Sequence, residues 1–325
     1  CGLFQGYKSL RKRNWSPPPF SVSSLDAVLL THAHLDHSGY LPLLVKQGYD
    51  GPVYCTQGTA DLCAVLLPDS GRLQEYDAER ANRKGYSKHS PALPLYTEAD
   101  AMRALERLEP RDFDQDFGAA KGLKACFAPA GHILGSATLR LDDGAIRLGF
   151  TGDLGRPDDL MMRPPAVMHA VDYLVVESTY GNRRHSGADP VAELGEVLAR
   201  TAARGGVTIV PAFAVGRTQA LLQAVQLLKA DGRIPDLLPV YLNSPMAIDV
   251  TRIYHEHRQE HRLDDHACHR MCLAAKFVQS VEESRRLNEM RGPMLIIAGS
   301  GMATGGRVVH HLRRYLPDSR STALF

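Results

Sequence analysis

His32-Ala33-His34-Leu35-Asp36-His37 is the stretch that decides how the rest of this sequence is interpreted. It places four metal-capable side chains within six residues, directly after a short apolar run (residues 26–30) that predicts a strand. Side chains on the turn after a strand can converge on one point. Imidazole and carboxylate ligands without thiolate suit Zn²⁺, with Mn²⁺ as a substitute. The spacing therefore indicates two metals sharing one loop, with His32 and His34 on one and Asp36 and His37 on the other.

Two later strand ends supply further candidate ligands. His132 lies between Gly131 and Gly135, and glycines let backbone and ligand approach closely. Asp153 follows the apolar run 146–150. A lone His or Asp at a strand end is more often structural, but in this order, after residues 32–37, the two complete a metal-ligand series. The sequence thus predicts two Zn²⁺ held by His32, His34, Asp36, His37, His132 and Asp153.

Composition limits the classes of protein to which the chain can belong. Its 325 residues allow one large or two ordinary domains. With 38 basic and 36 acidic side chains, the net charge of +2 gives no global attraction to nucleic acid. Six cysteines are too sparse for a disulfide scaffold and suit a reducing cytoplasm, which we expect as the location. No apolar run approaches the roughly 20 residues that span a bilayer, so no membrane partner is expected.

The two halves of the chain differ in the secondary structure that their sequence patterns predict. The first half is β-rich: strand-like runs occur at 51–55, 123–128, 137–141, 145–150 and 173–177, a mostly helical stretch lies at 60–115 with an irregular part at 85–94, and residues 8–20 are interpreted as a loop. The second half holds three strand–helix units, which predict a parallel α/β sheet: 206–211 with 217–230, 239–243 with 245–257, and 294–298 with 306–315. Both chain ends look cut from something longer, and residues 322–325 resemble the start of a strand.

The ordered ligand motifs resemble those of the metallo-β-lactamase superfamily. The resemblance implies a four-layer αββα sandwich with the metals at one edge. His32, His34 and His132 would hold one zinc, Asp36 and His37 the other, with Asp153 bridging both. The family's opening Asp would fall just before Cys1 and its two C-terminal His motifs beyond Phe325. The N- and C-terminal pieces of the sandwich are therefore expected to be missing.

Residues 177–181, Glu177-Ser178-Thr179-Tyr180-Gly181, resemble the acidic motif that opens the β-CASP insertion of nucleic-acid nucleases. Residues 211–217, 243–247 and 299–307 also resemble segments of that branch. The implied organisation is a metallo-β-lactamase domain over 1–186, incomplete at its N-terminus and continuing beyond the chain end, with an inserted parallel α/β β-CASP domain over 187–325. Glu rather than Asp at position 177 is similar to the RNA-processing branch, which favours RNA over DNA as the partner.

The resemblance implies a zinc-dependent ribonuclease. Two metals with a bridging hydroxide would hydrolyse RNA phosphodiester bonds, leaving 5′-phosphate and 3′-hydroxyl ends. Asp36 is a candidate proton acceptor as well as a ligand. Glu177 is expected to orient a metal-ligating His, or else to cap a turn.

Other functions stay open at this stage. They are a DNA-directed β-CASP nuclease and an inactive homologue that scaffolds an RNA-processing complex. A hydrolase of thioesters or lactams is disfavoured because residues 187–325 would then have no purpose. The sequence does not decide between internal and 5′-processive cleavage, and it leaves a homo-oligomer open.

Candidate substrate-binding residues lie at strand-to-helix junctions of the second half. The glycine-rich loop 299–306 precedes a predicted helix, whose first backbone N–H groups can cradle a phosphate, although a plain tight turn is an equal alternative. The candidates are Ser244, Gly301, Thr304, Arg307 and Arg217.

Two further clusters have weaker interpretations. The basic residues Lys8, Arg11, Lys12 and Arg13, with Trp15, either follow an RNA backbone or form a solvated loop. Cys268 and Cys272, four residues apart, could bind zinc from one helix. Because no second pair of thiols lies nearby, a structural zinc site is disfavoured.

Overall fold

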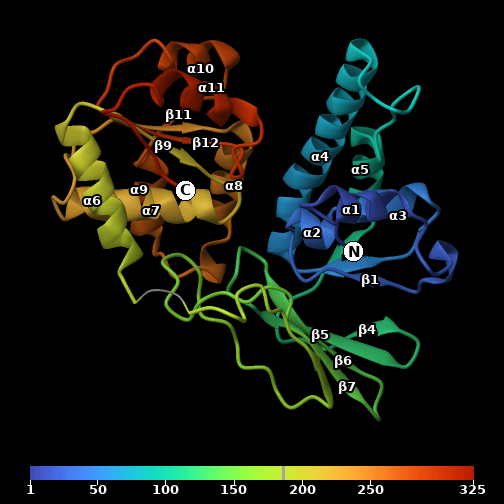
Figure 1. The fold of residues 1–325 in the computed structure, drawn as a ribbon. Helices are drawn as coiled ribbons and strands as arrows, with labels where there is room; N and C mark the ends of the chain where they lie inside the picture. Colours follow the sequence, from blue (N-terminus) through green and yellow to red (C-terminus); the bar gives the residue numbers. More distant parts are fainter. Residues whose placement is uncertain (185–186) are drawn as a thin grey trace. The chain divides into compact units, whose positions relative to one another are not determined.

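A computed structural model describes residues 1–184 and 187–325, and these divide into two compact units (Figure 1). Unit 1 comprises Cys1–Asp159 and Pro164–Glu177; unit 2 comprises Leu160–Arg163 and Ser178–Phe325. The domain boundary expected between residues 186 and 187 involves residue 186, which lies outside the described residues. That boundary stays a prediction. The units separate slightly earlier, between Glu177 and Ser178.

Unit 1 contains two sheets that pack against each other. The smaller is parallel, in the order β1 (Val28–Leu29), β2 (Val53–Cys55), β3 (Leu108–Pro110). The larger runs in the order β4 (Phe117–Ala120), β5 (Leu123–Pro129), β6 (Ala137–Asp142), β7 (Arg147–Phe150), β8 (Tyr173–Val175). Its strands are antiparallel up to β7, and β8 joins β7 in parallel. Alternate residues of β5 and β6, such as Phe127 and Leu139, are buried. Leu29 and Tyr54 of the smaller sheet pack against them.

The helices of unit 1 have clear start and stop signals. The long helix α4 (Gln57–Lys84) begins after Thr56, whose hydroxyl accepts a hydrogen bond from the Thr59 amide, and ends at Gly85 in the left-handed conformation. A capping box at Thr97 starts α5 (Glu98–Leu105). The helical prediction for 60–115, with an irregular part after Gly85, is confirmed in its main features. The remaining short helices are α1 (Lys8–Arg11), η1 (Lys12–Trp15), η2 (Val22–Ser24), α2 (Leu35–Ser38) and α3 (Leu41–Lys46).

The interpretation of residues 8–20 as a loop was wrong for its first part. Helical turns occupy α1 and η1. They are held by the buried side chain of Asn14, which accepts a hydrogen bond from the Phe4 amide at 2.8 Å and donates one to the Phe4 carbonyl at 2.9 Å. Trp15 stays 61% exposed.

Unit 2 is built on one parallel sheet, as predicted. Its order is β11 (Lys276–Phe277), β10 (Val240–Asn243), β12 (Met294–Ala298), β9 (Val207–Pro211), β13 (Thr322–Ala323). Every residue of β9 and β12 is buried, which explains why the two strands are apolar except for Thr208 of β9. Residues 322–325, expected to begin a strand, contribute β13 beside β9.

Helices cover the sheet of unit 2. Val308 and Tyr315 of α11 (Gly306–Tyr315) pack on residues of β9 and β12. The helix that follows β9, α7 (Arg217–Ala230), has the predicted bounds. The others are α6 (Pro190–Ala203), α8 (Pro245–Glu256), η3 (Arg258–Glu260), α9 (Asp265–Leu273) and α10 (Val281–Leu287). Along the described residues, every helix falls short of the length or the apolarity that crossing a bilayer would require.

Candidate metal centre

The loop after β1 is fixed by its own backbone. His34 precedes α2, and its carbonyl accepts hydrogen bonds from the amides of His37 and Ser38, both at 2.8 Å. The Ser38 hydroxyl donates to the Ala33 carbonyl at 2.8 Å. Gly2 closes the back of this turn, because a Cβ there would lie 1.4 Å from the Asp36 carbonyl oxygen. The short helical turn thus determines where the side chains of residues 34–37 point.

The loop between β5 and β6 presents His132. The Ser136 hydroxyl accepts a hydrogen bond from the His132 amide at 2.9 Å. The Gly135 carbonyl accepts the hydroxyls of Thr56 at 2.6 Å and Thr59 at 2.9 Å, which ties the loop to the start of α4. Gly135 has φ +72°, and a Cβ there would lie 2.2 Å from the Thr59 nitrogen. Only glycine therefore fits this position without displacing the loop.

The turn after β7 presents Asp153. The Thr151 amide donates to the Val175 carbonyl at 3.0 Å, and the Thr151 hydroxyl accepts from the Glu177 amide at 3.1 Å. Gly155 then lies directly on the His132 loop, since a Cβ on it would fall 1.8 Å from the Gly131 carbonyl oxygen. The two loops are therefore in backbone contact.

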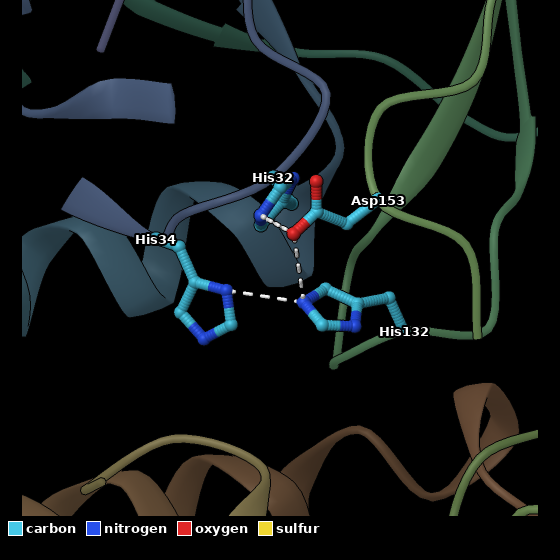
Figure 2. A group of neighbouring side chains, drawn as sticks. All are labelled: His32, His34, His132 and Asp153. Carbon is cyan, nitrogen blue, oxygen red and sulfur yellow. Dashed lines mark hydrogen bonds and ion pairs between the residues drawn. The ribbon is translucent and has the colours of Figure 1, made fainter. Parts of the chain in front are cut away.

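These three segments bring His32, His34, His132 and Asp153 together (Figure 2). One ligand atom from each lies within 4.8 Å of the others. His34 Nδ1 is 3.1 Å from His132 Nε2. Asp153 Oδ2 is 3.5 Å from His132 Nε2 and 3.8 Å from His32 Nε2. Three imidazole nitrogens and a carboxylate oxygen thus converge from segments that are distant in the sequence.

His37 and Asp36 lie beside this cluster. His37 Nε2 is 3.1 Å from Asp153 Oδ1, so the two carboxylate oxygens of Asp153 face different histidines. Asp36 Oδ2 lies 3.9 Å from His37 Nε2, and its side chain is 53% exposed. All six predicted ligands therefore lie in one region of unit 1, four in a tight group and two at its side.

His32 shows most directly that the cluster fits a cation. It is fully buried, and among the described residues its Nε2 has no hydrogen-bond partner. Thr31 Oγ1 lies 3.3 Å from the other ring nitrogen and accepts its proton in the tautomer that leaves a lone pair on Nε2. A buried lone pair without a donor is costly unless a metal occupies it. Apart from its position before the motif, nothing in the sequence indicated a role for Thr31.

The pKa shifts in the His/Asp cluster leave the imidazoles of His32 and His34 neutral and therefore able to bind a metal. Burial, together with the neighbouring His37, lowers the pKa of His32 to about 2. Burial and His132 lower the pKa of His34 to about 4. The hydrogen bond from His37 lowers the pKa of Asp153 to about 2. Neutral imidazoles beside an ionised carboxylate are the forms that bind a divalent metal.

His132 and His37 feel opposing influences. Burial lowers the pKa of His132, although the negative charges of Asp153 and Glu177 act to raise it. Burial also disfavours the charged form of His37, but the hydrogen bond and charge of Asp153 raise its pKa overall. Glu177, half-buried, thus acts electrostatically on a cluster histidine. The orienting role expected for Glu177 stays a prediction.

The predicted substrate-binding residues lie in unit 2, where β10, β12 and β9 are neighbours and end at one edge of the sheet. Ser244 caps α8, its hydroxyl accepting from the Ala247 amide at 3.3 Å. Arg307 donates to Asn243 Oδ1 at 2.8 Å and to the Gln279 carbonyl at 2.7 Å. Both side chains therefore already serve the local fold.

The other three candidates differ in exposure. Gly301 is buried against the Phe213 ring, where a Cβ would come within 2.7 Å of a ring carbon. Arg217 is exposed, with its guanidinium 5.6 Å from the centre of the same ring, and Thr304 is exposed as well. Substrate binding by these five residues stays a prediction.

The fold and the cluster together define a class: a protein with a two-sheet unit and a parallel α/β unit, whose His/Asp cluster is suited to hold a divalent metal. Comparison with known proteins places it more closely. The Beta-lactamase superfamily domain matches residues 2–209 and the Beta-Casp domain matches residues 218–325. The chain belongs to this β-CASP family of the β-lactamase superfamily, whose fold implies binding of divalent metal.

Relatives of the chain are named as a ribonuclease and as a transcription termination factor. "Ribonuclease TTHA0252" of Thermus thermophilus is 35% identical over 100% of this chain and 72% of its own length. "Transcription termination factor FttA" is 32% identical in Methanocaldococcus jannaschii and 33% in Methanosarcina mazei, over 100% of this chain and 51% of each relative. The chain thus spans about half the length of the termination factors. A solved protein of unknown function from Enterococcus faecalis V583 matches at a TM-score of 0.41 and 16% identity, over 84% of this chain and 58% of that one, too distant to inform the site.

Proposed function

We propose that this chain is a zinc-dependent ribonuclease that hydrolyses RNA phosphodiester bonds and leaves 5′-phosphate and 3′-hydroxyl ends. The observation that carries the proposal is the convergence of His34, His132 and Asp153 on the buried Nε2 of His32, which has no hydrogen-bond partner among the described residues. The names of the relatives, a ribonuclease and a termination factor, support RNA as the substrate. A cytoplasmic protein and a homo-oligomer are compatible with this role.

Two Zn²⁺, with Mn²⁺ as a substitute, are the proposed cofactors. His32, His34 and His132 would hold one ion, and Asp36 and His37 the other. Asp153 is suited to serve both, because its two oxygens face different histidines at 3.1 and 3.5 Å. When bound, such a pair of ions lowers the pKa of a water and offsets the charge that grows on phosphate oxygens.

The residues of the chain supply positioning and proton transfer. Asp36 is the candidate proton acceptor because its carboxylate is the most exposed in the cluster, at 53% against 28% for Asp153. Glu177 is proposed to hold the His132 ring through its charge. Arg217 and Thr304 are proposed to contact the RNA backbone. Ser244, Gly301 and Arg307 would shape the loop that does so, since all three already pack or bond within unit 2.

The decisive test compares labelled RNA and DNA of one sequence, using wild type, Asp36→Asn and the control Asp77→Asn. Asp77 is an exposed carboxylate on α4 and leaves the cluster untouched. We expect RNA cleavage by wild type and Asp77→Asn, and at least a hundredfold loss in Asp36→Asn, a typical contribution of a general base. Equal cleavage of DNA would overturn the RNA assignment.

Metal analysis of the same three proteins separates loss of chemistry from loss of the site. About two zinc ions per His/Asp centre are expected in wild type. A wild-type protein that binds no metal at the centre would contradict the proposal, whatever its cleavage activity. Substrates with 5′-phosphate and 5′-hydroxyl ends then distinguish internal from 5′-processive cutting.

A further inference from the structure

Unit 2 holds a second group of metal-capable side chains, separate in sequence and in unit from the His/Asp cluster. Cys268 and Cys272 are four residues apart on α9 and so share one face of that helix. His255 lies in the last turn of α8, thirteen residues before Cys268. One ligand atom from each of the three lies within 4.8 Å of the others. The sequence analysis disfavoured a zinc site at Cys268 and Cys272 because no second pair of thiols lies nearby. In the folded chain, the imidazole of His255 provides the third candidate ligand.

The distance between the histidine and one thiol of this group matches that between two ligands of a tetrahedral ion. His255 Nδ1 is 3.5 Å from Cys268 Sγ. Bonds of about 2.3 Å from zinc to sulfur and about 2.0–2.1 Å to nitrogen separate two tetrahedral ligands by about 3.5 Å. Cys268 is fully buried, whereas His255 and Cys272 are half-buried, so the group has a protein side and a solvent side. Three protein ligands with a solvent-facing fourth position form an open site.

We infer that Cys268, Cys272 and His255 bind a thiolate-preferring divalent cation, Zn²⁺ by their chemistry, with water as the fourth ligand. This donor set differs from that of the first cluster, which contains no sulfur. Soft thiolates select zinc over the harder Mn²⁺ and Mg²⁺, so the two sites would differ in metal preference.

A neighbouring histidine is not the fourth ligand. His261 is buried close by, but its Nε2 lies 3.0 Å from the Tyr254 carbonyl, and its Nδ1 accepts the Leu263 amide at 3.3 Å. Both ring nitrogens therefore contact backbone groups, and the ring also hydrogen-bonds the side chain of Cys268. That leaves the exposed side of the group to solvent.

Metal binding would change the protonation of Cys268, Cys272 and His255. A hydrogen bond from the Cys268 thiol lowers the pKa of Cys272, and the same bond, with burial, raises the pKa of Cys268 to about 12. Cys272 is thus the first thiolate to form. On binding, both thiol protons pass to solvent. The His255 ring proton then moves from Nδ1 to Nε2, so that Nδ1 offers its lone pair to the ion.

Arg258 opposes that change in the metal-free protein. Its guanidinium donates to His255 Nε2 at 3.2 Å, which holds the ring proton on Nδ1. The ion must therefore break this contact. Arg258 is 41% exposed and keeps its ion pair with Asp265 at 2.8 Å, so its side chain can move away while remaining paired.

Cobalt loading of the reduced full chain tests the inference, because thiolate ligation gives Co²⁺ an intense near-ultraviolet charge-transfer band that His and Asp ligands do not. We expect this band in wild type. Cys272→Ser should lose most of it and lower the Co²⁺ affinity at least about tenfold, the smallest loss typical of disturbing a metal site. His255→Ala should weaken binding comparably. Cys126→Ser, which removes a half-buried cysteine of unit 1, is the matched control and should keep the band.

Absence of the band in wild type would overturn the inference, as would a band that persists unchanged in both Cys272→Ser and His255→Ala. Far-ultraviolet circular dichroism of each variant shows whether it is folded, and Cys272 is the safer substitution because it is only half-buried. The readout is independent of RNA cleavage, so failure here and failure of the ribonuclease proposal are distinguishable.

Discussion

His311 is a buried histidine outside both metal-capable clusters, and its surroundings show how packing alone can fix a protonation state. Its Nε2 accepts a hydrogen bond from the Asn243 amide group at 2.6 Å, and its Nδ1 donates to Asn288 Oδ1 at 2.8 Å. Burial, with the charges of His310 and Arg307, lowers the pKa of His311 to about 4. The network joins the end of β10 to α11 and holds the strand-end region of unit 2.

A pH dependence follows for His311. Its folded pKa of about 4 lies below the ordinary value of 6.5, so the unfolded chain takes up a proton first as the pH falls. Stability present above pH 6.5 is therefore lost between pH 6.5 and 4, at about 1.4 kcal/mol per pH unit and up to roughly 3 kcal/mol in all. We expect the difference in unfolding free energy between wild type and His311→Gln, measured by amide exchange in β12, to shrink over that range. A constant difference would contradict the pKa shift.

Single side chains of the His/Asp cluster were predictable, but their geometry was not. The six predicted ligands follow from residue type and spacing, because strand ends place side chains on turns. Which atoms converge depends on the backbone between them, above all on Ser136 and Gly135 in the His132 loop. His255 had no sequence signal, since only the packing of α8 beside α9 brings it to Cys268.

At the element scale, the His132 loop depends on a close approach that one glycine permits. Gly135→Ala is expected to cost about 3 kcal/mol or more, because φ +72° strains an alanine and its Cβ would meet the Thr59 nitrogen at 2.2 Å. Gly144 is the matched control: its φ is +90°, but nothing lies within 4 Å of its Cβ position, so Gly144→Ala should cost only the strain, about 1–2 kcal/mol.

The two variants should differ both in thermal stability and in metal affinity, and Gly135→Ala should show the larger loss of each. The physical reason is that displacing Gly135 moves the loop that carries His132, whereas Gly144 lies in the hairpin between β6 and β7, outside the cluster. Equal losses of stability and of metal affinity in both variants would show that backbone strain, and not the contact with α4, decides the effect.

Helices and strands were predicted best where burial alone determines the sequence pattern. β9, β10 and β12 consist mostly of apolar residues because the sheet buries nearly all of them, and their pattern was therefore unambiguous. The turns of α1 and η1 were missed because Asn14 anchors them through a contact ten residues away, with Phe4. Short, polar helices of this kind are held by tertiary contacts and leave no periodic pattern.

At the scale of the whole molecule, the two units have separate cores. β5 and β6 form the core of unit 1 with the smaller sheet, and β9 and β12 form that of unit 2. The net charge of +2 supplies no long-range attraction for RNA, so in the proposed ribonuclease the affinity would arise locally, from the metals and from individual cations such as Arg217. Each unit should then respond to its own ligand.

This independence can be measured by amide exchange in the Cys272→Ser variant, in which only the His/Asp cluster should bind zinc. A ligand at 100 times its dissociation constant stabilises the state that binds it by about 2.7 kcal/mol, equivalent to about a hundredfold slower exchange through global opening. We expect added Zn²⁺ to slow exchange in β5 and β6 toward that limit and to leave β9 and β12 unchanged. The same experiment with His32→Gln added to Cys272→Ser, which also removes the buried ligand of the His/Asp cluster, should show no slowing in either unit. Equal slowing of β5, β6, β9 and β12 would mean that the units unfold as one, and that metal binding in unit 1 stabilises the whole chain.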